Sequence, residues 1–378
     1  MQVFLCGVFT GPFNGQMQTL FGVRDALNKK FNLRIIYYPF KGLLFPFKWF
    51  YFLVNLLFCV FCNKKPRLFY LSLNRSRLGF WFRDFPVFFI AGVTNSKIIC
   101  HLVGSDIGDF ISSLNRIEIF ILKYYFKKIN TWVVLGKAME SQVANIYKDL
   151  NIHESSKCFK NKNFNSLIVR GFFPNEANSF VNNNSNVSKK SFNYPINIGY
   201  MSNLIEEKGV VEFIESIIYL KEEHNIDIKA WIAGVYIEKP SLRLKESIEN
   251  AQQKEYIDML GLIMGDDKWM KLVDTDIFIL PTYYRSESLP LALVEAMKAN
   301  CYCISSSVGE IKDLLGDDRG LIIDNISSHS ISEGVKFALS DINDFKSKTH
   351  NASRYVGKEF AFNNFQTKIV NLVNSFKL

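Results

Sequence analysis

The chain has 378 residues and 48% of them are hydrophobic, which excludes a disordered protein and gives room for two domains of ordinary size. The formal net charge is +9, and residues 1–150 hold 19 Lys and Arg against 7 Asp and Glu, so the positive charge lies in that part. A basic stretch of this kind favours an anionic partner. We expect that partner to be a membrane surface, because phenylalanines are frequent in the same stretch. We expect no nucleic acid, because no nucleic-acid-binding motif is visible.

The first half alternates apolar runs with helical stretches, as a parallel sheet with crossover helices does. The apolar start Met1–Val8 leads directly into a loop with Gly11 and Gly15, so we expect no signal peptide. These glycines allow close approach of the backbone to a ligand, although a plain tight turn is the alternative. The predicted strands are Gln2–Val8, Leu33–Pro39, Arg67–Leu73, Lys97–Val103, Thr131–Leu135 and Ser166–Arg170.

The stretch Trp49–Cys62 consists of apolar or near-neutral residues with one asparagine. A membrane-spanning helix needs about 20 apolar residues, and an extension back to Leu43 includes Pro46 and Lys48. We therefore expect a helix of the fold, with a membrane span as the alternative. One face is expected on the sheet and the other in the lipid headgroup region. Basic and aromatic residues surround it: Lys48, Lys64, Lys65, Arg67, Arg75, Arg77, Arg83 and the cluster Phe80–Phe85.

His101 lies near the end of a predicted strand and is followed by Gly104 and Asp106. Ligands of open parallel sheets bind at the carboxyl ends of the strands, so both side chains are candidates for ligand contacts. A lone histidine is nevertheless more often structural. Beyond these residues, the polar and asparagine-rich stretch 174–195 predicts a linker between domains 1–173 and 196–357.

In the second domain a strand is followed by a loop and a helix. The apolar run Asp276–Pro281 predicts a buried strand, and Leu291–Ala299 is rich in good helix formers. Ser288 can cap this helix, and Pro290 suits its first turn. A ligand is expected beside the start of such a helix.

Two carboxylates, Glu287 and Glu295, lie on either side of this helix start. Acidic residues favour helix N-termini in general, so both can simply complement the helix dipole. The alternative is a sugar-nucleotide site, in which the diphosphate lies on the free N–H groups. The carboxylates would then accept hydrogen bonds from sugar hydroxyls.

Three segments resemble the retaining glycosyltransferases of family 4. Glu287 and Glu295, within ESLPLALVEAM, match the E-x7-E motif, and Val308–Leu315 (VGEIKDLL) is similar to the segment V-G-G-I-P-E-V-V. Met201–Gly209 (MSNLIEEKG) resembles G-R-L-x-x-E-K-G. The likeness is strongest over Ile196–Asp324. It implies an α/β protein of the GT-B fold, with two Rossmann-like domains facing across a cleft and a C-terminal helix over 358–378 that packs on the first domain.

The resemblance also implies roles for individual residues. Lys208 matches the lysine that binds the donor diphosphate, whereas Asn203 stands where the family has an arginine, which removes one positive charge. Glu295 would bind the ribose hydroxyls and Glu287 the transferred sugar. Other expected contacts are the N–H groups at Ser288, Leu289 and Leu291, the glycines Gly15 and Gly209, the sugar- or acceptor-contacting His101, and Asp106, which would orient an acceptor hydroxyl.

The implied activity is transfer of a sugar from a nucleotide-sugar to a saccharide acceptor, with retention at the anomeric carbon. The basic and aromatic first domain suits a lipid-linked acceptor at the cytoplasmic face of the plasma membrane, in the assembly of O-antigen, other lipopolysaccharide or capsule. Alternatives are a non-catalytic membrane-associated nucleotide-sugar binder and another sugar-nucleotide enzyme of the same fold. We expect no cofactor and no metal, since the seven cysteines lack the spacing of a zinc site.

Overall fold

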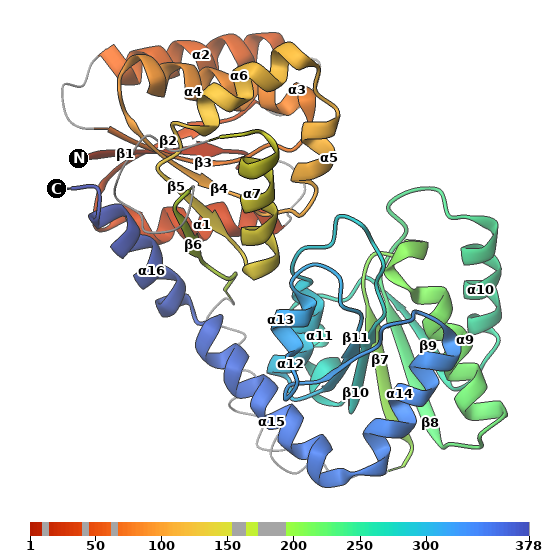
Figure 1. Ribbon diagram of the computed structural model, residues 1–378. Coiled ribbons are helices and arrows are strands. Elements are labelled where there is room, and N and C mark those ends of the chain that lie inside the picture. Colours follow the sequence, from red (N-terminus) through yellow and green to blue (C-terminus); the bar gives the residue numbers. More distant parts are fainter. Residues whose placement is uncertain (10–14, 40–44, 62–66, 153–163, 173–193, 378) are drawn as a thin grey trace. The chain divides into compact units, whose positions relative to one another are not determined.

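Two six-stranded parallel sheets organise the chain (Figure 1). The computed structural model describes residues 1–9, 15–39, 45–61, 67–152, 164–172 and 194–377. The predicted linker 174–195 therefore lies almost wholly outside the described residues, as do Gly11, Cys62, Lys64 and Lys65. The chain divides into two compact units, unit 1 with Met1–Phe172 and Phe362–Leu378, and unit 2 with Phe173–Ala361.

Unit 1 has the strand order β2-β1-β3-β4-β5-β6, with all neighbours parallel. Its strands are β1 Gln2–Gly7, β2 Asn32–Tyr37, β3 Arg67–Ser72, β4 Lys97–His101, β5 Thr131–Val134 and β6 Ser166–Ile168. Its helices are α1 Gly15–Asn28, α2 Phe45–Phe61, α3 Arg77–Gly79, the π-helix η1 Phe80–Asp84, α4 Phe85–Val93, α5 Ile107–Ser112, α6 Arg116–Phe126, α7 Lys137–Asp149 and α16 Phe362–Asn374. A parallel sheet needs both faces covered, and helices lie on both sides of this one (Figure 1).

One face of the unit 1 sheet is covered by α1 and α16, which join the strands in a single hydrophobic core. Phe365, Ile369 and Val373 of α16 are buried there together with residues of α1 and β1. The ring of Phe172 lies 4.8 Å from that of Phe365, measured between centroids. The chain's last helix thus completes the core of the unit that begins at Met1.

The other face of this sheet is covered by α2, α4 and α6 (Figure 1). Among the buried residues of this layer are Phe52 and Leu56 of α2, Val87 and Phe88 of α4, and Leu122 and Phe126 of α6. Helix α6 starts at a capping box, since the Asn115 side chain accepts from the Glu118 N–H at 3.0 Å and Glu118 accepts from the Asn115 N–H at 2.9 Å. The expected fold helix over Trp49–Cys62 is α2, which starts earlier, at Phe45. None of the helices among the described residues is both long and apolar enough to cross a bilayer.

Unit 2 has the strand order β12-β11-β10-β7-β8-β9, again all parallel. Its strands are β7 Ile196–Met201, β8 Ile228–Ala233, β9 Ile257–Gly261, β10 Ile277–Leu280, β11 Tyr302–Ser305 and β12 Leu321–Ile322. Its helices are the 3₁₀ turn η3 Glu206–Lys208, α9 Val210–Glu222, α10 Leu242–Gln252, α11 Gly265–Val273, α12 Leu291–Lys298, α13 Ile311–Leu315, α14 Ser328–Ser340 and α15 Ile342–Glu359. Both units are thus Rossmann-like, and the predicted α/β fold class is confirmed.

Candidate functional site

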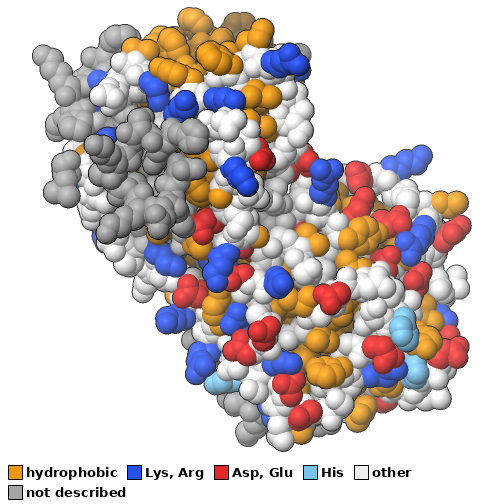
Figure 2. All heavy atoms as spheres, viewed as in Figure 1, with side chains coloured by type: hydrophobic (Ala, Val, Ile, Leu, Met, Phe, Trp, Pro, Cys, Tyr) orange, Lys and Arg blue, Asp and Glu red, His pale blue; other side chains and the backbone are white. Residues whose placement is uncertain are grey.

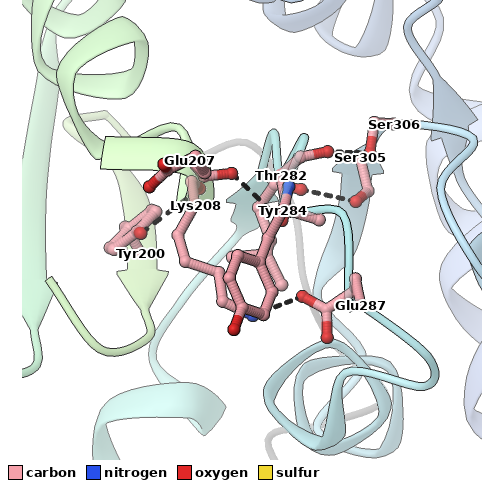
Figure 3. A network of polar contacts seen from close by, with 9 residues as sticks. Tyr200, Glu207, Lys208, Thr282, Tyr284, Glu287, Ser305 and Ser306 are labelled. Atoms are coloured by element: carbon pink, nitrogen blue, oxygen red, sulfur yellow. Dashed lines mark hydrogen bonds and ion pairs between the residues drawn. The ribbon is translucent and has the colours of Figure 1, made fainter. Parts of the chain in front are cut away.

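Three loops of unit 2 meet where the adjacent strands β7, β10 and β11 end. The turn after β7 and the loop after β10 are joined at the Glu207 carbonyl, which accepts from the Tyr283 N–H at 2.8 Å and from the Thr282 hydroxyl at 3.3 Å. The Ser306 hydroxyl, after β11, donates to the Thr282 carbonyl at 2.5 Å. This framework holds the side chains of the candidate site in place (Figure 3).

The centre of the site is an ion pair between Lys208 and Glu287, with 2.6 Å between Nζ and Oε2. Both side chains are nearly buried, at 13% and 9% exposure, and they are 79 residues apart in the sequence. The Lys208 side chain runs past the ring of Tyr284, with Nζ 4.6 Å from the ring centroid (Figure 3). A cation and an acceptor are therefore fixed at the same edge of the sheet, in surroundings where charge-assisted hydrogen bonds are strong.

Two glycines let these loops approach each other closely. Gly209 has φ +76°, and a Cβ there would lie 2.2 Å from the Pro281 carbonyl oxygen. Gly309 has φ +58°, and its Cβ would lie 2.5 Å from the carbonyl oxygen of Glu287 and 2.6 Å from that of Ser288. Only glycine takes up such positions without strain. Sequence reasoning selected Gly209 for the site but missed Gly309, although both lie in the segments that carry the family resemblance.

A second ion pair holds Glu295 of α12, whose Oε1 lies 2.7 Å from Nζ of Lys268 on α11. Burial raises the pKa of Glu295, while Lys268 opposes this shift through its charge and hydrogen bond. Both glutamates of the E-x7-E motif are therefore paired with a lysine. Lys268 and Tyr284 were missed from the sequence, because no local motif marks either residue.

The start of α12 differs from the prediction. The residue at its N-cap is Pro290, with φ −71° and ψ 112°, and the Pro290 side chain makes no capping hydrogen bond. The expected cap by Ser288 is wrong, because Ser288 lies two residues too early, and its carbonyl instead accepts from the Glu310 N–H at 2.7 Å. Leu289 is buried and Leu291, the first helical residue, is half-buried. The helix start is thus held by main-chain contacts with the loop after β11.

Asn203 lies in the turn after β7 with an exposed side chain, and its carbonyl accepts from the Ile205 N–H at 2.9 Å. The structure therefore brings Lys208, Gly209, Glu287 and Ser288 together, whereas Glu295 forms its own pair with Lys268. The role of Asn203 stays a prediction. The described residues contain no group of three or more His, Cys, Asp and Glu that could hold a metal ion.

The candidates of unit 1 lie at the start of α1 and after β4. Gly15 opens α1, and a Cβ there would meet nothing within 4 Å. His101 is completely buried, with Nδ1 2.8 Å from the Tyr70 hydroxyl and with Nε2 unpaired within the described part of the chain. Burial lowers the pKa of His101 to about 3, so the ring is neutral. Asp106 forms an ion pair with Arg75. The ligand roles of these three residues stay predictions.

Comparison with known proteins relates part of the chain to a known family. The sequence model of the family described as Glycosyl transferases group 1 matches residues 183–356. TuaC of Bacillus subtilis, named for a glycosyltransferase role in teichuronic acid biosynthesis, is 28% identical over 141 residues, which are 36% of this chain and 31% of TuaC. WcaL of Escherichia coli, named likewise for colanic acid biosynthesis, is 30% identical over 129 residues, 33% of this chain and 31% of WcaL. The aligned parts thus cover about a third of these relatives.

Solved structures resemble the whole chain in fold. HepE of Anabaena in complex with UDP and glucose has a TM-score of 0.65 at 11% identity and covers 99% of both chains. Sucrose-phosphate synthase of Thermosynechococcus elongatus has a TM-score of 0.69 at 12% identity and covers 100% of this chain and 99% of its own. The chain therefore has the GT-B fold of two Rossmann-like domains, and its residues 183–356 match the sequence model of the glycosyl transferases group 1 family.

Proposed function

We propose that the chain is a retaining glycosyltransferase that moves a sugar from a nucleotide-sugar donor to a saccharide acceptor. The observation that carries this proposal is the buried ion pair of Lys208 and Glu287 where β7 and β10 end. A departing diphosphate needs a cation and N–H donors, and the transferred sugar needs hydrogen-bond acceptors. Lys208 supplies the cation for the diphosphate, and Glu287 supplies an acceptor for the transferred sugar. Both side chains become available to the donor when the ion pair between them opens.

The rest of the donor site follows from the loop that leads into α12. The N–H groups of the turn from Glu287 to Leu291 stabilise the leaving diphosphate, although Pro290 has no N–H and that of Glu287 donates to the Tyr284 carbonyl at 2.9 Å. Glu295 accepts from the ribose hydroxyls once Lys268 gives way. His101 and Asp106 of unit 1 serve the transferred sugar and the acceptor. The leaving phosphate acts as the base in a front-face attack, and no metal is required.

The acceptor and the location are part of the same proposal. The relatives named for teichuronic and colanic acid biosynthesis support a role in polysaccharide assembly, with O-antigen, lipopolysaccharide or capsule as the product class. Structural neighbours solved with UDP or UDP-glucose support a nucleotide-sugar donor. A lipid-linked saccharide acceptor, met by a peripheral protein at the cytoplasmic face of the plasma membrane, fits the basic and aromatic surface of unit 1.

Release of nucleoside diphosphate from a panel of sugar nucleotides tests the activity. Glu287→Ala should lower the rate at least tenfold, because a lost charge-assisted hydrogen bond is worth roughly 1.5–3 kcal/mol. The matched control is Glu222→Ala, which removes an exposed ion pair with Lys254 of similar length, 2.7 Å. Donor binding without release in the parent protein would favour the non-catalytic binder instead.

A further inference from the structure

The layer formed by α2, α4 and α6 has an apolar outer face. Phe47 of α2 is 75% exposed, Val93 of α4 is 71% exposed, and Phe120 of α6 is 74% exposed. The exposed apolar side chains of this layer, including the short helices α3 and η1, are Phe47, Phe50, Tyr51, Val54, Leu57, Phe58, Leu78, Phe82, Phe89, Val93, Ile117, Phe120 and Tyr124. Figure 2 shows hydrophobic side chains gathered over this part of unit 1. We call this surface the α2–α4–α6 face.

The helices beneath this face are fixed to the fold, so their outer side chains are presented on a firm base. Phe52 of α2 is buried against Tyr38, with 5.7 Å between ring centroids, while the Trp49 ring N–H donates to the Phe82 carbonyl at 2.7 Å. On α4, Phe88 packs on Tyr125 of α6 with 5.8 Å between centroids. A helix with one side on a sheet and an apolar outer side needs a further apolar environment.

The charges on the α2–α4–α6 face all have the same sign. Its described helices contain only two acidic residues: Asp84 is completely buried, and Glu118 accepts from both Arg77, at 2.7 Å, and the Trp81 ring N–H, at 2.8 Å. The basic residues on these helices and at their ends are Lys48, Arg77, Arg83, Arg116, Lys123, Lys127 and Lys128. The face is therefore apolar and basic, with no exposed acid on the described helices.

We propose that the α2–α4–α6 face docks unit 1 on an anionic lipid bilayer. The exposed aromatic and aliphatic side chains enter the boundary between headgroups and acyl chains, while the basic residues lie at the level of the anionic headgroups. A second copy of the chain fits this face poorly, because a symmetric contact would bring basic residues of both copies together without acids between them. This inference assigns a surface to the membrane association proposed above.

The surface differs from the one that the sequence indicated. The predicted surface consisted of the run Trp49–Phe61, the cluster Phe80–Phe85 and the basic residues that flank them, whereas the structure adds α6, which starts 55 residues after the end of α2. Ile117, Phe120 and Tyr124 repeat at the spacing of one helix side and are exposed together. Lys123 and Lys127 lie beside them on the same helix end.

Vesicle flotation of the full chain tests the proposal. The parent protein should float with vesicles of phosphatidylcholine and phosphatidylglycerol, float weakly with phosphatidylcholine alone, and be partly released by salt. Phe47→Ser combined with Phe120→Ser should lower partitioning at least tenfold, whereas leucine at both positions should retain it. The matched control, Met270→Ser with Phe337→Ser, changes two exposed apolar residues of unit 2 and should float like the parent.

The basic residues have their own test. Lys123→Gln with Lys127→Gln should reduce binding to the anionic vesicles about fivefold for each lysine. Lys229→Gln with Lys245→Gln, on exposed positions of unit 2, is the control for net charge. Three results would overturn the proposal. The two lysine-to-glutamine pairs could lose vesicle binding equally, or the parent could float equally with neutral and anionic lipid. The parent could also be a dimer that Phe47→Ser with Phe120→Ser dissociates. Release of nucleoside diphosphate from a free nucleotide-sugar is measured without lipid as a separate readout. If release is normal and flotation fails, the docking proposal is wrong and the proposed function stands.

Discussion

Two completely buried side chains of unit 1, Asp84 and His101, should act in opposite directions on the pH dependence of stability. Burial raises the pKa of Asp84 from 3.8 to about 7, against hydrogen bonds from Asn74 that lower it. Burial lowers the pKa of His101 from 6.5 to about 3. Between about pH 4 and 6.5, Asp84 is therefore protonated in the folded protein and ionised in the unfolded chain. His101 is neutral in the folded protein and protonated in the unfolded chain.

The signs follow from proton linkage. The contribution of Asp84 to the free energy of unfolding is fully present below pH 3.8 and is lost as the pH rises to about 7, at most roughly 4 kcal/mol. The contribution of His101 is present above pH 6.5 and is lost as the pH falls to about 3, at most roughly 5 kcal/mol. Between about pH 4 and 6.5 these two contributions change with pH in opposite directions, so in the parent protein their effects on the free energy of unfolding nearly cancel.

Single substitutions should reveal the two slopes. Asp84→Asn leaves His101, so the free energy of unfolding should fall as the pH is lowered, by up to about 1.4 kcal/mol per pH unit. His101→Gln leaves Asp84 and should give a slope of the opposite sign. Over about two pH units the variants should diverge by up to roughly 5 kcal/mol.

Urea unfolding followed by circular dichroism at several pH values measures these slopes. The control is Asp25→Asn, since the Asp25 side chain is 54% exposed and should leave the parent slope unchanged. All other ionisable groups are shared by the two variants, so their contributions cancel in the comparison. Parallel slopes for Asp84→Asn and His101→Gln would refute the reasoning.

The candidate site makes three further predictions. Glu295→Ala should raise the donor KM about tenfold in steady-state kinetics, because a charge-assisted bond to the ribose is lost; an unchanged KM would contradict its role. Lys208→Ala should nearly abolish diphosphate release while Asn203→Arg is tolerated, and full activity of Lys208→Ala would mean that another cation holds the phosphates. Gly309→Ala should lower the thermal unfolding midpoint, since φ is +58° and its Cβ would meet the Glu287 carbonyl; an unchanged midpoint would contradict that geometry.

The alternation of apolar runs and helical stretches was enough to predict the strands of the unit 1 sheet, and the apolar run Asp276–Pro281 predicted β10 of unit 2, because buried parallel strands are nearly continuous apolar segments. The spacing of Glu287 and Glu295 likewise pointed to the candidate site. The partners of these glutamates could not be predicted equally well. Lys208 was selected through the family resemblance, but its direct pairing with Glu287 depends on how the loops after β7 and β10 meet.

Other features depend on contacts that leave no local pattern. Lys268 reaches Glu295 from a different helix, 27 residues earlier in the chain. Ser288 suited a helix cap by residue type, yet the backbone of Pro290 begins the helix and the Ser288 carbonyl is engaged with Glu310. The complete burial of His101 against Tyr70 depends on the pairing of β3 with β4, since the sequence indicates only where the strand ends.

The return of α16 to unit 1 has a consequence for synthesis on the ribosome. Unit 2 is continuous, Phe173–Ala361, and its residues are complete before Phe365, Ile369 and Val373 leave the exit tunnel. Until then α1, whose Leu20 and Val23 belong to the same hydrophobic core, lacks its neighbour α16. The half of the protein that is translated first is therefore the half that finishes folding last, and its nascent form offers a hydrophobic surface to chaperones throughout the translation of unit 2.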